Sequence, residues 1–235
     1  MSDHLEGAHT SAAWDRVWSR HSYRLEPIRS ERARIKIAAA VAIGMEVAPS
    51  DRVLDIACGF GHTLIEGAAR WPGHARLFGL DISATALHQA RENFQRAHLD
   101  TQLTRAEWPR LPFRTASIDK VIAFMAPFPA VIQEVKRVLV PNGKLFVIAP
   151  SRDSVISAWY RIHESLRPSH FDELRNYTAR DLVAFLGASM TVEEWRVLQS
   201  GADRPFSGKI DRAIARLFPD WGRYVVVKCA KPATG

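Results

Sequence analysis

The sequence contains little cysteine and no apolar segment long enough to cross a membrane. Only two of the 235 residues are cysteine, Cys58 and Cys229, so a disulfide framework is not indicated. The apolar stretch from Ile37 to Val47 is too short for a span, which requires about 18 residues or more. The first residues, with Asp3 and Glu6, lack the basic-then-apolar order of a secretory signal. We therefore expect a cytoplasmic protein without a membrane span.

The charge balance is basic, with a formal net charge of +7 and an isoelectric point near 9.8. Much of the excess is arginine, and it is densest between Arg16 and Lys36. Such a balance permits a solvated basic surface, an acidic small molecule or carrier, or a nucleic acid as its explanation. We favour the solvated surface as the explanation. An acceptor that bears phosphate or carboxylate groups is the second explanation.

One segment combines a buried strand, a glycine turn and the start of a helix. It runs from Arg52 to Thr63 and reads RVLDIACGFGHT, and the next apolar run ends in Asp81. Glycine permits positive φ and close approach of main-chain amides to a ligand, and an acid at the tip of the next strand can accept both ribose hydroxyls. Leu64 replaces the third glycine of a dinucleotide fingerprint, and the lysine of a P-loop is absent. The pattern predicts an adenosine-like cofactor without a polyphosphate, in which Asp55 could engage an ammonium group.

On these residues the chain resembles the class I S-adenosylmethionine-dependent methyltransferases, closely over about residues 35 to 150. The first motif of that family is acid-x-Gly-x-Gly-x-Gly, and Ala57 stands at the first glycine. The resemblance implies S-adenosylmethionine as the cofactor, methyl transfer as the reaction and no metal. It implies these contacts with the cofactor: for the methionine end Asp55, Ala57, Gly59 and Gly61, for the ribose Asp81, and for the adenine Ile82.

The order of the predicted elements supports one α/β domain over residues 1–235. Apolar periodicity predicts helices over 32–45, 83–97 and 130–139. Strands are predicted from residue 52 and over 77–81, 101–104, 119–124, 144–148, 191–198 and 224–230. A turn at Pro141-Asn142-Gly143 separates the last of these helices from the fifth strand. We predict a three-layer sandwich around a seven-stranded, mostly parallel sheet whose last strand is antiparallel, the Rossmann-like methyltransferase fold.

The adenine contact departs from the family pattern. Arg105 occupies the position where the family commonly has an acid that accepts from the adenine amino group. We expect the main chain of Ala106, with Glu107 nearby, to substitute for it. Trp108 either covers the ring or packs on the surface of the loop. Phe124, at the end of the fourth strand, is also assigned to the cofactor site.

The acceptor is predicted to be a small molecule. The Asn/Asp-Pro-Pro-aromatic motif of enzymes that methylate base or glutamine nitrogens is absent after the fourth strand, where the chain reads AFMAPF from Ala123. No appended RNA-binding module is visible. Met125 is assigned to the acceptor pocket. An RNA methyltransferase and a non-catalytic protein that only binds the cofactor are the alternatives.

Three segments outside the shared core are expected to determine the substrate. Residues 1–31 could form a helical lid over the cofactor, or an amphipathic helix packed on the sheet edge. Residues 151–177 form an insertion on the substrate side, and residues 201–222 a second one, which could cap the pocket or mediate a homodimer contact. The residues that we assign to the acceptor in these segments are Tyr23, Tyr160 and Tyr177, with His163 or His170 as a general base for an oxygen acceptor.

Overall fold

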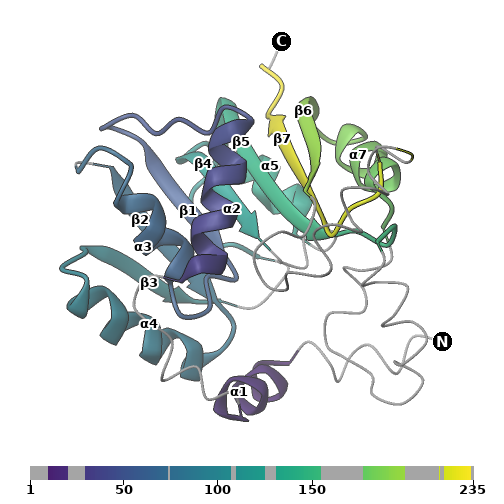
Figure 1. The fold of residues 1–235 in the computed structure, drawn as a ribbon. Helices are drawn as coiled ribbons and strands as arrows, with labels where there is room; N and C mark the ends of the chain where they lie inside the picture. Colours follow the sequence, from purple (N-terminus) through teal and green to yellow (C-terminus); the bar gives the residue numbers. More distant parts are fainter. Residues whose placement is uncertain are drawn as a thin grey trace.

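The computed structural model describes residues 10–20, 30–73, 75–106, 110–124, 131–154, 177–198, 217 and 220–233. Seven strands in this part of the chain form one sheet, in the order β3-β2-β1-β4-β5-β7-β6 (Figure 1). Their bounds are β1 Arg52–Ile56, β2 Arg76–Asp81, β3 Thr101–Arg105, β4 Ile118–Phe124, β5 Leu139–Pro150, β6 Thr191–Leu198 and β7 Tyr224–Ala230. Neighbouring strands are parallel from β3 to β5, and β7 is antiparallel to both β5 and β6. The predicted fold class is confirmed.

Helices cover both faces of this sheet. They are α1 Ser11–Arg20, α2 Glu31–Ala42, α3 His62–Ala68, α4 Ala84–Arg96, α5 Ile132–Val138 and α7 Ala179–Gly187. Side chains of α2, α3 and α4 pack with one buried cluster, whereas those of α5 and α7 pack with the other. Within β1, Val53 belongs to the first cluster and Leu54 to the second. Because successive side chains of a strand point to opposite faces, each strand contributes to both cores.

Two elements differ from the sequence-based expectations. Strand β5 begins at Leu139, directly after α5, and includes the predicted turn around Asn142, whose φ is 61°. The pairing of β4 with β5 shifts register between Ile118 and Lys120, so the predicted turn is accommodated as an irregularity of the ladder. Helix α7 was not predicted, although Thr178 and Asp181 form a reciprocal capping box at its start.

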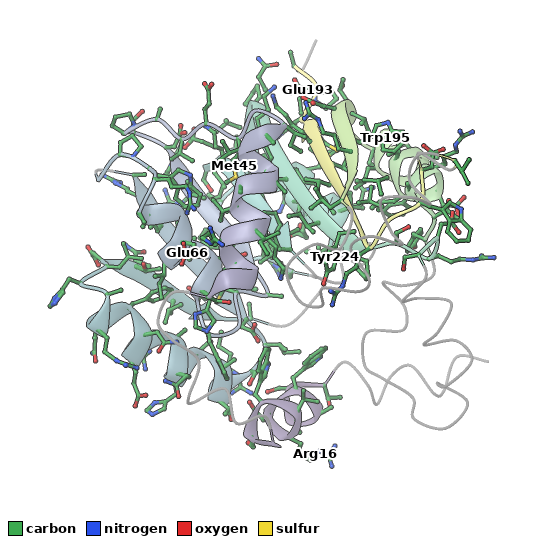
Figure 2. All side chains as sticks on the ribbon, in the orientation of Figure 1. Arg16, Met45, Glu66, Glu193, Trp195 and Tyr224 are labelled. Carbon is green, nitrogen blue, oxygen red and sulfur yellow. The ribbon has the colours of Figure 1, made fainter. Side chains whose placement is uncertain are left out.

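Ion pairs hold the edge of the sheet that lies opposite the carboxyl ends of the parallel strands. Glu193, labelled in Figure 2, accepts hydrogen bonds from Lys144 of β5 and lies 3.3 Å from Lys228 of β7. Asp51 receives a hydrogen bond from Lys120 in the same way at the start of β1. In the part of the chain that the structure describes, no helix is long and apolar enough to span a membrane.

Candidate functional site

The glycine turn lies between β1 and α3, where the strand order reverses between β1 and β4. Ligands of open α/β sheets bind at the carboxyl ends of the strands beside such a reversal. Ala57, Gly59 and Gly61 have φ values of 56°, 54° and 79°. Gly61 caps α3, and a Cβ atom there would lie 2.4 Å from the ring of Phe94, so both conformation and packing require glycine. Ala57 adopts the left-handed region in spite of its Cβ, which costs about 1 kcal/mol.

Asp55 brings a carboxyl group to the base of this turn. Its side chain is buried, with 2% of the residue exposed, and no described residue offers a hydrogen bond to its Oδ2 atom. Burial raises the pKa of Asp55 to about 8, Lys36 opposes this shift through its positive charge, and the neighbouring Asp81 adds to it. A buried carboxyl oxygen without a hydrogen-bond donor is destabilising unless a ligand supplies that donor. A cationic ligand group would both satisfy Oδ2 and favour the ionised form.

Asp81 ends β2 and connects the glycine turn to the start of α4. Its Oδ2 accepts from the main-chain N–H of Gly59 at 2.8 Å, and its Oδ1 accepts from that of Ser83 at 2.9 Å. Burial raises the pKa of Asp81, although these main-chain hydrogen bonds oppose the shift. Each carboxylate oxygen retains a further lone pair, which a pair of ribose hydroxyls could use.

The adjacent strand ends define the side assigned to adenine. Ile82 is buried, and its carbonyl oxygen accepts from Nε of Arg105 at 3.1 Å. The N–H of Ala106 donates to the carbonyl of Asp81 at 3.2 Å, which continues the pairing of β2 with β3. The main-chain group that Ala106 could offer to an adenine amino group is therefore its carbonyl oxygen.

Helix α1 lies against this turn. The indole of Trp18 packs on Phe60, with ring centroids 4.8 Å apart and planes inclined at 46°. Asp15 accepts from Oγ of Ser83 at 2.5 Å and from the main-chain N–H of Thr85 at 3.1 Å. Ser83 is the N-cap of α4, and its Oγ also accepts from the N–H of Ala86.

The remaining predicted site residues are divided between described and undescribed parts of the chain. Phe124 is buried at the end of β4 in the cluster with α2, α3 and α4. Tyr177 is half-buried before α7 and packs on Phe185, with ring centroids 6.0 Å apart. The following predicted site residues lie outside the described residues: Tyr23, Glu107, Met125, Tyr160, His163 and His170.

Sequence reasoning missed the role of Asp15 at this site. A carboxylate near a helix N-terminus is favourable. The helix that Asp15 contacts begins almost seventy residues later, so nothing local in the sequence indicates that pairing. Arg105 was recognised as a departure from the family pattern, whereas its contact with the main chain of Ile82 was not.

Comparison with known proteins shows what the segment around the glycine turn resembles. Residues 53–143, which contain the glycine turn and Asp81, match the model of a methyltransferase domain. Over 133 residues the chain is 31% identical to a U6 snRNA (guanine-N(2))-methyltransferase of Bos taurus, a match that covers 52% of this chain and 26% of the relative. Over 109 residues it is 28% identical to a 2-phytyl-1,4-naphtoquinone methyltransferase of Synechocystis, covering 43% of this chain and 46% of the relative. The chain thus spans less than half the length of these relatives.

Solved structures share the fold at low sequence identity. A SAM-dependent methyltransferase from Thermotoga maritima superposes with a TM-score of 0.65 at 16% identity, over 95% of this chain and all (100%) of that one. A geranyl diphosphate C-methyltransferase from Streptomyces coelicolor, in complex with S-adenosyl-L-homocysteine, gives 0.62 at 16% identity, over 93% and 84% of the two chains. A [4+2]-cyclase gives 0.62 at 18% identity, over 86% and 81%. Residues 53–143 thus match a methyltransferase domain, and the chain has the Rossmann-like fold of these methyltransferase structures.

Proposed function

We propose that this protein binds S-adenosylmethionine at the glycine turn and transfers its methyl group to a small-molecule acceptor. The observation that carries the proposal is the buried Oδ2 of Asp55 beneath the turn, to which no described residue donates a hydrogen bond. The positive charge of Lys36 acts on this carboxyl group by lowering its pKa. The ammonium group of the methionine moiety would supply the missing donor. The ribose would lie at Asp81 and the adenine against Ile82 and the carbonyl of Ala106.

The reaction is a direct displacement. An oxygen, nitrogen or carbon atom of the acceptor forms a bond to the methyl carbon, and the carbon–sulfur bond breaks with its electron pair remaining on sulfur. The products are the methylated acceptor and S-adenosylhomocysteine, and the proton that the new methyl group replaces on the acceptor oxygen, nitrogen or carbon passes to a base or to water. The sulfonium is already activated, so positioning and exclusion of water supply most of the catalysis. His163 or His170 stays our prediction for the base that an oxygen acceptor requires.

The proposal of a small acceptor rests on relatives and on the sequence after β4. Relatives named for naphthoquinone and menaquinone precursors, and a structural neighbour named for geranyl diphosphate, suggest an apolar acceptor, which could carry an anionic group. Because a [4+2]-cyclase has a similar fold, the fold alone does not determine the reaction. The relative named for U6 snRNA and the charge of +7 keep RNA as the second candidate.

Binding of the cofactor is tested by isothermal titration calorimetry with S-adenosylhomocysteine. We expect binding of micromolar order, with a loss of at least about tenfold in Asp81→Asn because the charged acceptor of both ribose hydroxyls is removed. Asp100→Asn, a substitution of an exposed aspartate, is the matched control and should bind like the wild type. Absence of binding to the wild type, or equal binding to Asp81→Asn, would overturn the assignment of the site.

Transfer is tested separately with methyl-labelled S-adenosylmethionine and three acceptors: a reduced demethylated naphthoquinone, an isoprenyl diphosphate and total RNA. Label in either small molecule supports the proposal and identifies the acceptor class. Label in RNA alone, with a steep dependence on salt, would replace the proposal by the RNA alternative. Cofactor binding without transfer to these acceptors or to a cell extract would favour a non-catalytic protein.

A further inference from the structure

Asp15 fastens helix α1 to the first turn of α4. Its Oδ1 atom accepts both the Ser83 hydroxyl and the Thr85 amide, at 2.5 and 3.1 Å. Partial burial raises the pKa of Asp15, but these hydrogen bonds and the positive charge of Arg105 outweigh the burial and hold the pKa below its usual value. The carboxylate is therefore ionised at neutral pH, and it lies where the positive end of the α4 dipole favours a negative charge. Ser83 follows Asp81 by two positions, so this contact is adjacent to the proposed ribose site.

Arg105 fastens α1 at a second point. Its Nε donates to the carbonyl of Ile82 at 3.1 Å, and its Nη2 donates to the hydroxyl of Ser11, which belongs to the first turn of α1. The same guanidinium group thus joins α1 to the residue next to Asp81. This arginine occupies the position at which the similar methyltransferases commonly have an acid that contacts adenine. Its side chain is used here to hold a helix.

Trp18 covers the glycine turn itself. Its six-membered ring packs on Phe60 and would lie 3.4 Å from a Cβ atom added to Gly59. The N–H of Gly59 in turn donates to Asp81 at 2.8 Å. The same helix therefore contacts the methionine side of the proposed site through Trp18 and the adenosine side through Asp15 and Ser11.

We propose that α1 is a closing element of the cofactor site, that Asp15 and Arg105 are the positioning residues that hold it closed, and that its closure slows release of the cofactor. This inference rests on the proposed function, because it concerns the same site. It assigns to Arg105 a role in closing the site instead of a role in recognising adenine.

The construction of α1 is suited to opening. A helix of ten residues is marginal in water by itself, so its docked position depends on its contacts with the rest of the domain. Among the described residues these contacts include the hydrogen bonds of Asp15 and Ser11, the packing of Trp18 and the burial of Ala13. The net contribution of each such hydrogen bond is modest, so a minor population of an open state is expected in the absence of ligand.

The test measures the dissociation rate of S-adenosylhomocysteine by stopped-flow displacement in Asp15→Ala and Arg105→Ala. We expect dissociation to be roughly tenfold faster in each variant, because each loses a hydrogen bond to a charged group. Asp15→Asn retains an acceptor oxygen for Ser83 and Thr85, so it should restore much of the wild-type rate. The controls are Asp100→Ala and Arg114→Ala, which remove exposed side chains of the same types and should dissociate like the wild type.

Hydrogen exchange of the peptide that spans residues 11–20 reports on the helix itself. We expect faster exchange in the two variants than in the wild type, and slower exchange in the wild type once S-adenosylhomocysteine is bound. Residues 118–124 of the central strand β4 serve as the internal reference and should exchange equally in all variants, which distinguishes opening of α1 from general unfolding.

Wild-type dissociation rates in both variants, or exchange of residues 11–20 that is unaffected by the variants and by the ligand, would overturn the inference while leaving the cofactor site intact. If the wild type binds no S-adenosylhomocysteine, the proposed function fails instead. Even then, exchange in the unliganded variants shows whether Asp15 and Arg105 hold α1.

Discussion

At the scale of single residues, the buried carboxyl group of Asp55 makes the stability of the folded protein depend on pH. Its folded-state pKa of about 8 lies far above the ordinary value of 3.8, so the folded protein retains a proton that the unfolded chain loses above pH 4. The free energy of unfolding therefore falls as pH rises from about 4 to about 8, by at most about 1.4 kcal/mol per pH unit for this group. Asp81, whose pKa is also raised, adds a decrease of the same sign.

Asp55→Asn should therefore stabilise the cofactor-free protein near neutral pH. We expect equal stability of variant and wild type at pH 4, and a gain on the order of 2–4 kcal/mol for the variant at pH 7, because asparagine cannot ionise. Urea unfolding followed by circular dichroism at several pH values measures the difference, in which the contribution of Asp81 cancels. A variant less stable than the wild type at pH 7 would show that the Asp55 carboxyl is not strained by burial.

Cofactor affinity should rise with pH over the same range. The ammonium group requires an ionised Asp55, so below pH 8 binding must be accompanied by release of about one proton. The charged or titratable neighbours that face Asp55 are Lys36, Asp81 and Cys58, and burial keeps the Cys58 thiol neutral by raising its pKa well above its usual value. Calorimetry at pH 7 in buffers of different ionisation enthalpy counts the protons. Affinity that is constant from pH 6 to 8.5 would contradict the assignment, and Asp55→Asn should show weak binding without proton release.

Gly61 and Gly73 form a matched pair for the glycine turn. An alanine at position 61 would place its Cβ 2.4 Å from Phe94 and take up a φ of 79°, whereas a Cβ at position 73 meets nothing within 4 Å. We expect Gly61→Ala to destabilise the protein by about 2 kcal/mol or more and to weaken cofactor binding, because the turn must shift. Gly73→Ala should leave both properties within about 0.5 kcal/mol of the wild type. Thermal unfolding and calorimetry on both variants provide the comparison.

At the scale of elements, the strands were the more predictable part. The strands predicted over 191–198 and 224–230 have those bounds in the structure. Strand β7 is a buried strand specified by its own apolar residues, whereas β6 is the partly exposed edge strand of the sheet. The helix expected over 32–45 ends at Ala42, and the turn at Asn142 became part of β5 because its neighbours pair with β4. Docking of α1 through Asp15 depends on residues distant in sequence, which periodicity cannot reveal.

The capping box at the start of α7 is a local sequence signal that did not lead to a predicted helix, and its contribution to stability can be tested. The Thr178 hydroxyl accepts from the N–H of Asp181, whose carboxylate accepts from the N–H of Thr178. Thr178→Ala should lower the free energy of unfolding by about 1 kcal/mol, because an amide at the helix start loses its acceptor. Thr178→Ser retains the hydroxyl and should remain within a few tenths of a kcal/mol of the wild type. A loss in the serine variant as large as in the alanine variant would point to the methyl group instead of the cap.

At the scale of the whole molecule, the two buried clusters lie on the two faces of the sheet. The candidate site lies at the ends of β1 and β2, next to the start of α4. The position of this site was predictable, because a glycine turn after one strand and an acid after the next must meet at one edge of a parallel sheet. The surroundings that choose the acceptor were not, since they come from segments outside the shared core. Cofactor contacts should therefore couple elements that are distant along the chain.

That coupling predicts a large thermal shift on binding. S-adenosylhomocysteine at a hundred times its Kd should stabilise the folded state by about 2.7 kcal/mol through mass action. For a domain of this size that corresponds to an increase in Tm of about 5 to 10 °C, measured by differential scanning fluorimetry. Adenosine, which lacks the ammonium group, should give a smaller shift in the wild type, and Asp55→Asn should reduce the advantage of the full ligand over adenosine. Equal shifts for the two ligands at the same concentration in the wild type would mean that the amino-acid end of S-adenosylhomocysteine, its ammonium group included, makes no favourable contact at the base of the glycine turn.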